Sequence, residues 1–239
     1  ERKNSYTSEV YRDDPTIMAW QLANEPRPGR GEWGKENFTV FSQWIDETAA
    51  YIKSLDSNHL VSTGNEGTAG SMESEELYQE IHRYQNIDYM TAHLWLLNWR
   101  WFDPLNAEVT YPEAINKALA YLQKHIDFAQ DIGKPLVFEE FGIPRDKHSY
   151  SPQSSTAYRD RYFTEVFNFI FENARAGGPL VGSNFWAWGG EGTARETVEA
   201  KWQRGDSYTG DPPQEPQGRN SVFASDSSTI SVLAKYAER

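Results

Sequence analysis

Residues 16–28, TIMAWQLANEPRP, contain an apolar run of strand length that ends on Asn24-Glu25 and is stopped by Pro26. Proline has no backbone N–H, so it cannot continue the hydrogen-bond ladder of a central strand. A carboxylate at the end of a buried strand is either a turn residue or a functional acid. The rest of the chain decides between these two interpretations.

Four later segments have the same pattern, an apolar run of strand length punctuated by Gly, Pro, Asn or Glu at its carboxyl end. They are LVSTGNEG at 60–67, DYMTAHLW at 88–95, PLVFEEFG at 135–142 and VGSNFWAWG at 181–189. Between them, apolar residues recur at spacings of three and four, which is typical of amphipathic helices. This spacing predicts helices over 37–56, 111–133, 154–176 and 228–239. Strands that alternate with helices indicate βαβ units and a parallel sheet.

The irregular stretches follow strands, so they lie at the carboxyl ends of the strands. They cover residues 96–110, 143–153 and 190–227. In an α/β (β/α)8 TIM barrel this face carries the active site. Such a barrel has eight strands, and the sequence shows fewer. Either three strands are hidden in the loops, or the chain lacks three βα units.

Composition limits the classes of function. The 239 residues are 38% hydrophobic and 24% charged, which indicates a folded globular chain. The net charge of −12 argues against a nucleic-acid partner, because phosphate binding needs a basic surface. There is no cysteine for a disulfide or thiolate site, and no run of about 18 apolar residues that predicts a membrane span. The aromatic content of 14%, with nine tryptophans, suits a groove that stacks flat ligands.

The predicted strand ends bring carboxylates and aromatic rings together, without a recognisable metal or phosphate motif. Two glutamates on separate strand ends are what a retaining glycosidase requires. One donates a proton to the leaving oxygen, and the other attacks the anomeric carbon. The two carboxyl groups of such an enzyme lie about 5–5.5 Å apart. The candidate residues at these ends are Asn24, Glu25, Glu66, His93, Trp95, Glu139, Glu140, Trp186 and Trp188.

Four motifs in this order, LANEPRP, TAHLW, KPLVFEEFG and GSNFWAWGG, resemble glycoside hydrolase family 5 of clan A. The resemblance is strongest to the endo-β-1,4-mannanase branch, and the segment GDPPQEPQGRNSVF is similar to bacterial mannanases. It covers the whole chain, from the family's fourth strand onward. It implies that residues 1–239 form a single catalytic (β/α)8-barrel domain that supplies strands four to eight. A missing N-terminal segment is then expected to complete the barrel.

The resemblance also implies roles for individual residues. Glu25 matches the general acid/base, and Glu140, directly before Phe141-Gly142, matches the nucleophile. Asn24 matches the residue that hydrogen-bonds the sugar 2-hydroxyl. Arg27 matches an arginine that reaches the leaving-group subsites. Because adjacent strand residues point to opposite faces, Glu139 is expected to be structural.

The remaining substrate-binding candidates are one histidine, three tryptophans and one glutamate. His93 resembles the strand-six histidine at the nucleophile, and Trp95 stands where many members have tyrosine. Trp186 resembles the tryptophan that floors the −1 sugar, and Trp188 and Glu66 are further binding candidates. Loop packing and sugar platforms are equal alternatives for Trp99 and Trp101. Packing is predicted for Trp20, Trp33, Trp44 and Trp202.

The sequence thus predicts a retaining endo-β-1,4-mannanase that acts on mannan, glucomannan or galactomannan and needs no cofactor or metal. The alternatives are another family 5 endo-glycanase, such as a β-1,4-glucanase or xylanase, and an inactive carbohydrate-binding fragment. The expected partner is a β-mannan polysaccharide. The expected location is outside the bacterial cell, on its surface or in the periplasm, although the chain shows no targeting signal.

Overall fold

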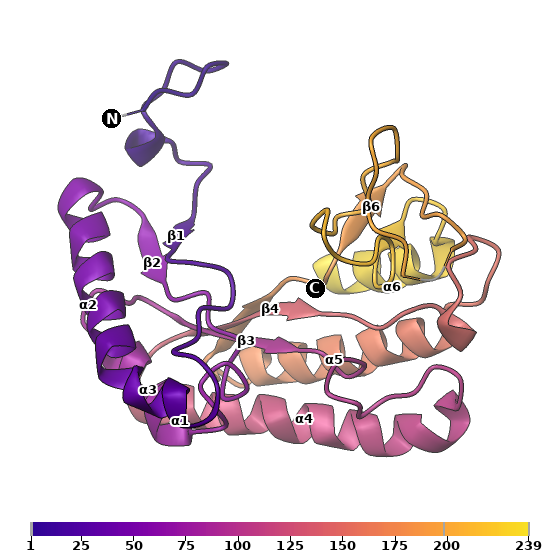
Figure 1. Ribbon diagram of the computed structural model, residues 1–239, viewed down its shortest axis with the longest axis horizontal. Coiled ribbons are helices and arrows are strands. Elements are labelled where there is room, and N and C mark those ends of the chain that lie inside the picture. Colours follow the sequence, from indigo (N-terminus) through magenta and orange to yellow (C-terminus); the bar gives the residue numbers. More distant parts are fainter. Residues whose placement is uncertain (1, 198, 239) are drawn as a thin grey trace. The chain divides into compact units, whose positions relative to one another are not determined.

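The computed structural model describes residues 2–197 and 199–238 (Figure 1). Its chain divides into two compact units. Unit 1 comprises Glu1–His93, His125–Phe138 and Pro179–Val181. Unit 2 comprises Leu94–Lys124, Glu139–Gly178 and Gly182–Arg239. None of the helices within the described residues is long and apolar enough to cross a membrane.

Five strands follow one another in sequence order, as βαβ units require. Strand β1 pairs in parallel with β2, a parallel bridge from Ser62 to Tyr89 leads to β3, and the remaining order is β3-β4-β5. At the strand starts, Met90 N donates to Pro135 O at 2.8 Å and Leu136 N to Pro179 O at 2.8 Å. The bounds are β1 (Ala19–Gln21), β2 (Leu60–Ser62), β3 (Met90–Leu94), β4 (Leu136–Phe141) and β5 (Leu180–Ser183).

Two of the predicted strands are much shorter in the structure, and one is divided. The first two, expected over 16–26 and 60–67, keep only three residues each. The last, expected over 181–189, is split into β5 and a separate strand β6 (Trp188–Gly190), which pairs in parallel with β7 (Val222–Phe223). Apolar continuity predicts burial, but a strand continues only where a neighbouring backbone offers partners.

The helices expected over 37–56, 111–133, 154–176 and 228–239 are confirmed as α2, α4, α5 and α6, except that residue 239 lies outside the described residues. Helix α4 starts earlier than predicted, so residues 107–110 are helical rather than irregular. Apolar spacing predicted neither α1 nor α3; α3 begins where the Ser74 hydroxyl accepts from Leu77 N at 3.3 Å. The bounds are α1 (Gly31–Glu36), α2 (Phe38–Leu55), α3 (Glu75–Arg83), α4 (Ala107–Ile132), α5 (Ala157–Arg175) and α6 (Ser227–Ala237). Short 3-10 helices cover η1 (Tyr11–Asp13) and η2 (Asp146–His148).

The core of unit 1 forms where α2 and α3 pack beside β2 (Figure 1). Five fully buried side chains make up this cluster, and partly buried neighbours such as Leu22 and Phe41 pack against it. Burying an aliphatic side chain contributes about 1.5–3 kcal/mol, so this cluster fixes the strands that carry the first predicted site residues. The five are Ile45, Ala49, Val61, Ile81 and Ile87.

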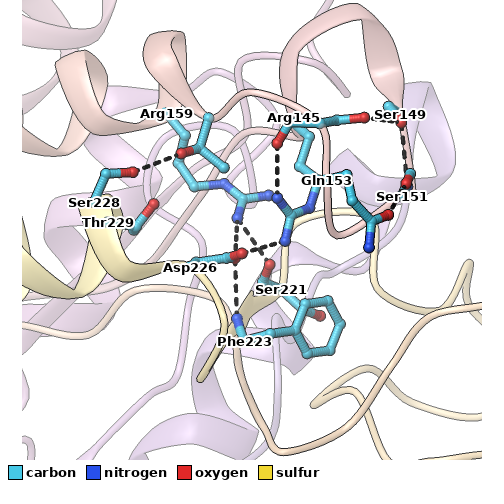
Figure 2. Close-up of polar contacts among 12 residues, drawn as sticks. Arg145, Ser149, Ser151, Gln153, Arg159, Ser221, Phe223, Asp226, Ser228 and Thr229 are labelled. Carbon is cyan, nitrogen blue, oxygen red and sulfur yellow. Dashed lines mark hydrogen bonds and ion pairs between the residues drawn. The ribbon is translucent and has the colours of Figure 1, made fainter.

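Unit 2 is built around the buried carboxylate of Asp226, which forms ion pairs with Arg145 and Arg159 (Figure 2). Asp226 Oδ2 lies 3.1 Å from Arg159 Nη1 and also accepts from Phe223 N at 3.1 Å. Arg159 Nε donates to Ile143 O at 3.1 Å, and its Nη1 to Ser221 O at 2.9 Å. This network therefore joins the segment that follows β4 to α5 and to the start of α6.

Close backbone approach also shapes the ends of β1 and β2. Glu25 N donates to Gly64 O at 2.9 Å, and Glu25 itself has a φ of 45°. Gly64 has a φ of +69°, and a Cβ built there would lie 2.0 Å from Ala23 O. Only glycine tolerates both conditions, since L-residues with a side chain are strained at positive φ. Gly64 thus sets the path on which Glu25 leaves β1.

Replacing the central carboxylate should weaken unit 2 strongly. We expect Asp226→Asn to lower the free energy of unfolding by about 3–5 kcal/mol, because two buried guanidinium groups lose their counter-charge. Urea unfolding followed by circular dichroism measures this loss. The matched control is Glu172→Gln, which removes an exposed ion pair with Arg175 and should cost under about 1 kcal/mol. Equal losses in both variants would contradict the role given to Asp226.

Glycine substitutions should separate steric clash from backbone strain. Gly133 after α4 has a φ of +76° and no atom within 4 Å of a built Cβ, so Gly133→Ala should cost only the strain, about 1–2 kcal/mol. Gly64→Ala adds the clash with Ala23 O and should cost clearly more. Urea unfolding of both variants tests this. A Gly64→Ala cost no larger than that of Gly133→Ala would show that Ala23 moves away freely.

Candidate active site

The carboxyl group of Glu25 lies among three polar side chains of unit 1. Its Oε1 is 2.9 Å from His93 Nδ1, and its Oε2 is 3.2 Å from Arg27 Nη2. Arg27 Nη2 also forms an ion pair with Glu66. The side chain of Glu25 is 23% exposed, whereas His93 and Glu66 are 2% and 4% exposed. Glu25 is therefore the member of this group, the Glu25 cluster, whose carboxyl group is accessible as well as hydrogen-bonded.

Three consecutive strands supply the Glu25 cluster. Glu25 and Arg27 follow β1, Glu66 follows β2, and His93 lies in β3. His93 N donates to Glu66 O at 3.1 Å, so the backbone of Glu66 positions His93 while its carboxylate holds Arg27. Four of the predicted residues thus lie together because the carboxyl ends of neighbouring parallel strands meet at one edge.

The electrostatics of the Glu25 cluster follow from its burial. A buried carboxylate such as Glu66 needs a paired charge, and the guanidinium of Arg27 supplies it. Arg27 also has donors left for Glu25. His93 Nδ1 can donate a hydrogen bond to an ionised Glu25, or accept one from a neutral Glu25 in its other tautomer. The histidine can therefore hold the Glu25 carboxyl group in either protonation state.

Unit 2 carries the predicted tryptophans and Glu140. The rings of Trp95 and Trp186 meet edge to face, 6.2 Å apart at an interplanar angle of 78°. Trp186 Nε1 donates to Asp211 Oδ1 at 3.0 Å. Trp188 is 54% exposed. Trp186 is therefore fixed at its edge and at its polar atom, whereas Trp188 presents its ring to solvent.

Glu140 lies near the end of β4, in a half-buried position beside the segment that carries Trp186. Trp186 N donates to Phe141 O at 2.8 Å. A Cβ built on Gly142 would lie 2.4 Å from Trp186 O, so the two segments approach closely only because residue 142 is glycine. The predicted nucleophile and the predicted sugar floor are thus on adjacent backbones. The catalytic roles of Glu140 and Glu25 stay predictions.

Several other candidates are placed less decisively. Asn24 is exposed and Glu139 is half-buried. The rings of Trp99 and Trp101 lie 5.0 Å apart, and Trp99 lies 5.1 Å from the ring of Tyr121 in α4, so both tryptophans pack in an aromatic cluster against this helix. This arrangement favours the packing interpretation for this pair.

Asp211 is a functional candidate that the sequence reasoning missed. Besides Trp186, it accepts hydrogen bonds from Thr209 Oγ1 at 3.0 Å and Gly218 N at 2.6 Å. It therefore orients the indole of Trp186 from a fixed position. The Gly-Asp-Pro run at 210–212 predicts a turn. No local pattern shows that its aspartate contacts Trp186, which lies 25 residues earlier in the chain.

Comparisons with known proteins agree with this arrangement. A family model described as glycoside hydrolase family 5, β-mannosidase-like, matches residues 1–239. Mannan endo-1,4-beta-mannosidase 4 of Solanum lycopersicum is 36% identical over 80% of this chain and 47% of its own length. Mannan endo-1,4-beta-mannosidase 7 of Arabidopsis thaliana is 36% identical over 77% of this chain and 42% of its own length.

Solved structures give the same result. A family 5 mannosidase from Rhizomucor miehei, a glutamate-to-alanine variant in complex with mannosyl-fructose, has a TM-score of 0.83 and 33% identity over 99% of this chain and 54% of that one. An endo-β-1,4-mannanase from Thermotoga petrophila has a TM-score of 0.66 and 28% identity over 99% and 47%. The chain spans about half the length of the curated relatives and structures it matches.

These matches confirm the predicted fold class, because the similar structures are (β/α)8 barrels and the strands here are parallel and alternate with helices. The match extends over all of the residues that carry the predicted motifs. The chain belongs to glycoside hydrolase family 5, in its β-mannosidase-like group.

Proposed function

We propose that the protein carrying this chain is a retaining endo-β-1,4-mannanase that hydrolyses internal bonds of mannan, glucomannan or galactomannan. The observation that supports this most is the Glu25 cluster, in which an accessible carboxyl group at a strand end is held by His93 at 2.9 Å and by Arg27 at 3.2 Å. The named relatives, mannan endo-1,4-beta-mannosidases, support the choice of polymer.

The proposed reaction has two displacements. In the first, a carboxylate oxygen of Glu140 forms a bond to the anomeric carbon while the glycosidic C–O bond breaks, and Glu25 gives its proton to the leaving oxygen. In the second, Glu25 takes a proton from water, whose oxygen bonds to the anomeric carbon and releases Glu140. Configuration is inverted twice and hence retained. Each step is complete with these two glutamates and water, so the mechanism calls for no cofactor or metal.

The remaining residues position the sugar in this proposal. Asn24 hydrogen-bonds the 2-hydroxyl, Trp186 forms the floor beneath the ring being cleaved, and Arg27 reaches the leaving sugars. Trp95 is packed against the edge of Trp186, so it supports the floor. Asp211 fixes the indole N–H of Trp186 at 3.0 Å. A neutral polymer outside the bacterial cell or in its periplasm is the substrate that this acidic, aromatic-rich chain suits.

A second candidate is an exo-acting β-mannosidase, which removes single mannose units from chain ends. It is favoured by the higher TM-score of the Rhizomucor miehei mannosidase, 0.83 against 0.66 for the Thermotoga petrophila endo-mannanase. Both candidates use the same two glutamates, so they differ only in how the groove is closed beyond the cleaved sugar.

The mode of attack separates the candidates. An endo-mannanase should lower the viscosity of galactomannan sharply while few reducing ends appear. An exo-mannosidase should release mannose with little change in viscosity. Higher turnover of carboxymethylcellulose or xylan than of mannan would contradict both and support another endo-glycanase.

Azide rescue should assign the two glutamates. With an aryl β-mannoside, Glu25→Ala should lose about 10²–10⁴-fold in turnover of the glycosyl-enzyme, and azide should restore it while forming the β-mannosyl azide. Azide should rescue Glu140→Ala by direct displacement and give the α-mannosyl azide. The matched control is Glu139→Gln, next to the nucleophile, which should keep most activity. The α product from Glu25→Ala, or loss of activity in Glu139→Gln alone, would contradict the assignment.

A further inference from the structure

The loop between β6 and β7 carries an unusually exposed aromatic ring. Tyr208 is 82% exposed, and its ring lies parallel to that of Trp202, with the centroids 6.0 Å apart and the planes inclined by 11°. Trp202 thus supports one face of the tyrosine, and the other face is open to solvent. A single exposed aromatic residue is common, so the surroundings of the ring have to decide its role.

The loop that carries this ring is a fixed structure. Gln217 N donates to Ala200 O at 2.8 Å, and Trp202 N to Pro213 O at 3.3 Å. The side-chain amide of Gln217 donates to Pro212 O at 2.8 Å and to Glu215 O at 3.0 Å. The backbone bonds cross the loop from one side to the other, so the loop that carries the tyrosine is held in place before any ligand arrives. A preorganised surface loses less entropy on binding.

The same loop also encloses a polar cleft, whose lining contains neither Tyr208 nor Trp202. Its volume is about 200 Å³, and its lining includes Ser207 and Thr209, the two neighbours of Tyr208. Asp206 and Arg195 also line it, with Arg195 Nη2 2.6 Å from Asp206 Oδ1. The match to a pyranose therefore rests on the ring itself, because an exposed aromatic face suits the apolar C–H face of a sugar.

The same loop is continuous with the candidate active site within unit 2. Tyr208 is three residues from Asp211, which binds Trp186 Nε1 at 3.0 Å, and three extended residues span at most ~11 Å. A Cβ built on Gly210 would lie 3.0 Å from Trp188 O, so this segment runs directly beside β6. The exposed rings of Trp188 and Tyr208 therefore come from neighbouring segments.

We propose that Tyr208, supported by Trp202, is a further sugar-binding platform that holds a pyranose unit of a β-linked mannan chain outside the bond-cleaving subsites. This inference rests on the proposed function and deepens it, because it assigns the loop between β6 and β7 to the recognition of long chains. Substrates too short to reach the platform gain nothing from it.

Tyr208→Ala tests this in the protein that carries the chain. We expect kcat/KM for mannohexaose to fall about three- to tenfold, the loss of one aromatic contact, and that for an aryl β-mannoside to stay within about twofold. Tyr208→Phe keeps the platform and should match the wild type. Tyr51→Ala, which removes an exposed tyrosine of α2, is the matched control and should change neither rate. Unchanged mannohexaose kinetics, or equal losses on both substrates, would overturn the proposal.

A binding measurement separates failure of this inference from failure of the proposed function. Wild-type protein should be retarded in native gels containing galactomannan, and Tyr208→Ala should be retarded less, whether or not the protein turns the polymer over. Absence of turnover with normal, Tyr208-dependent retardation would refute only the mannanase activity. Turnover together with equal retardation of the wild type and Tyr208→Ala would refute only the platform.

Discussion

The buried charge of Asp226 is the constraint on which unit 2 depends. Burial lowers the pKa of Arg159 to about 10, although the neighbouring Asp226 opposes this shift, and the guanidinium therefore remains charged at neutral pH. The two buried guanidinium groups, of Arg145 and Arg159, share the carboxylate of Asp226. They also donate to the backbone carbonyl groups of three residues, Ile143, Ser221 and Ser154. Each of these acceptors fixes a different segment. One of them follows β4 by only a few residues, so the backbone that carries Glu140 is fixed by the same charges.

Unit 1 uses the same principle on a smaller scale. Glu66 is buried and therefore requires Arg27, and Arg27 in turn is held where it reaches Glu25. The stabilising pair and the predicted catalytic group share one guanidinium. This sharing explains why a residue at the end of β2 matters to a carboxylate at the end of β1. Both networks therefore connect the folding of the strands to the positions of polar groups at their carboxyl ends.

Local patterns predicted the strand order and the long helices, because apolar spacing and a terminal Gly or Pro can be recognised within a short stretch of sequence. The positions of Glu25, Glu66 and His93 at strand ends followed from this order, and their contacts in unit 1 agree with it. The features that the sequence did not predict depend on contacts between residues far apart in the chain. The break between β5 and β6 reflects pairing with Val222–Phe223, and the reach of Asp211 to Trp186 spans a long loop. No spacing rule contains such contacts, and the catalytic roles rest on family resemblance.

In the proposed mechanism Glu25 serves as acid and then as base, and its hydrogen-bond partners suit this role. A lone arginine beside it would stabilise only the ionised form. Here the guanidinium of Arg27 also forms an ion pair with the buried Glu66, so its charge is shared between two carboxyl groups. His93 adds a partner that can donate or accept, according to its tautomer. A group that must change its protonation state in each half-reaction needs neighbours that stabilise both states. In the Glu25 cluster, His93 can donate or accept a hydrogen bond, and Arg27 is also paired with Glu66.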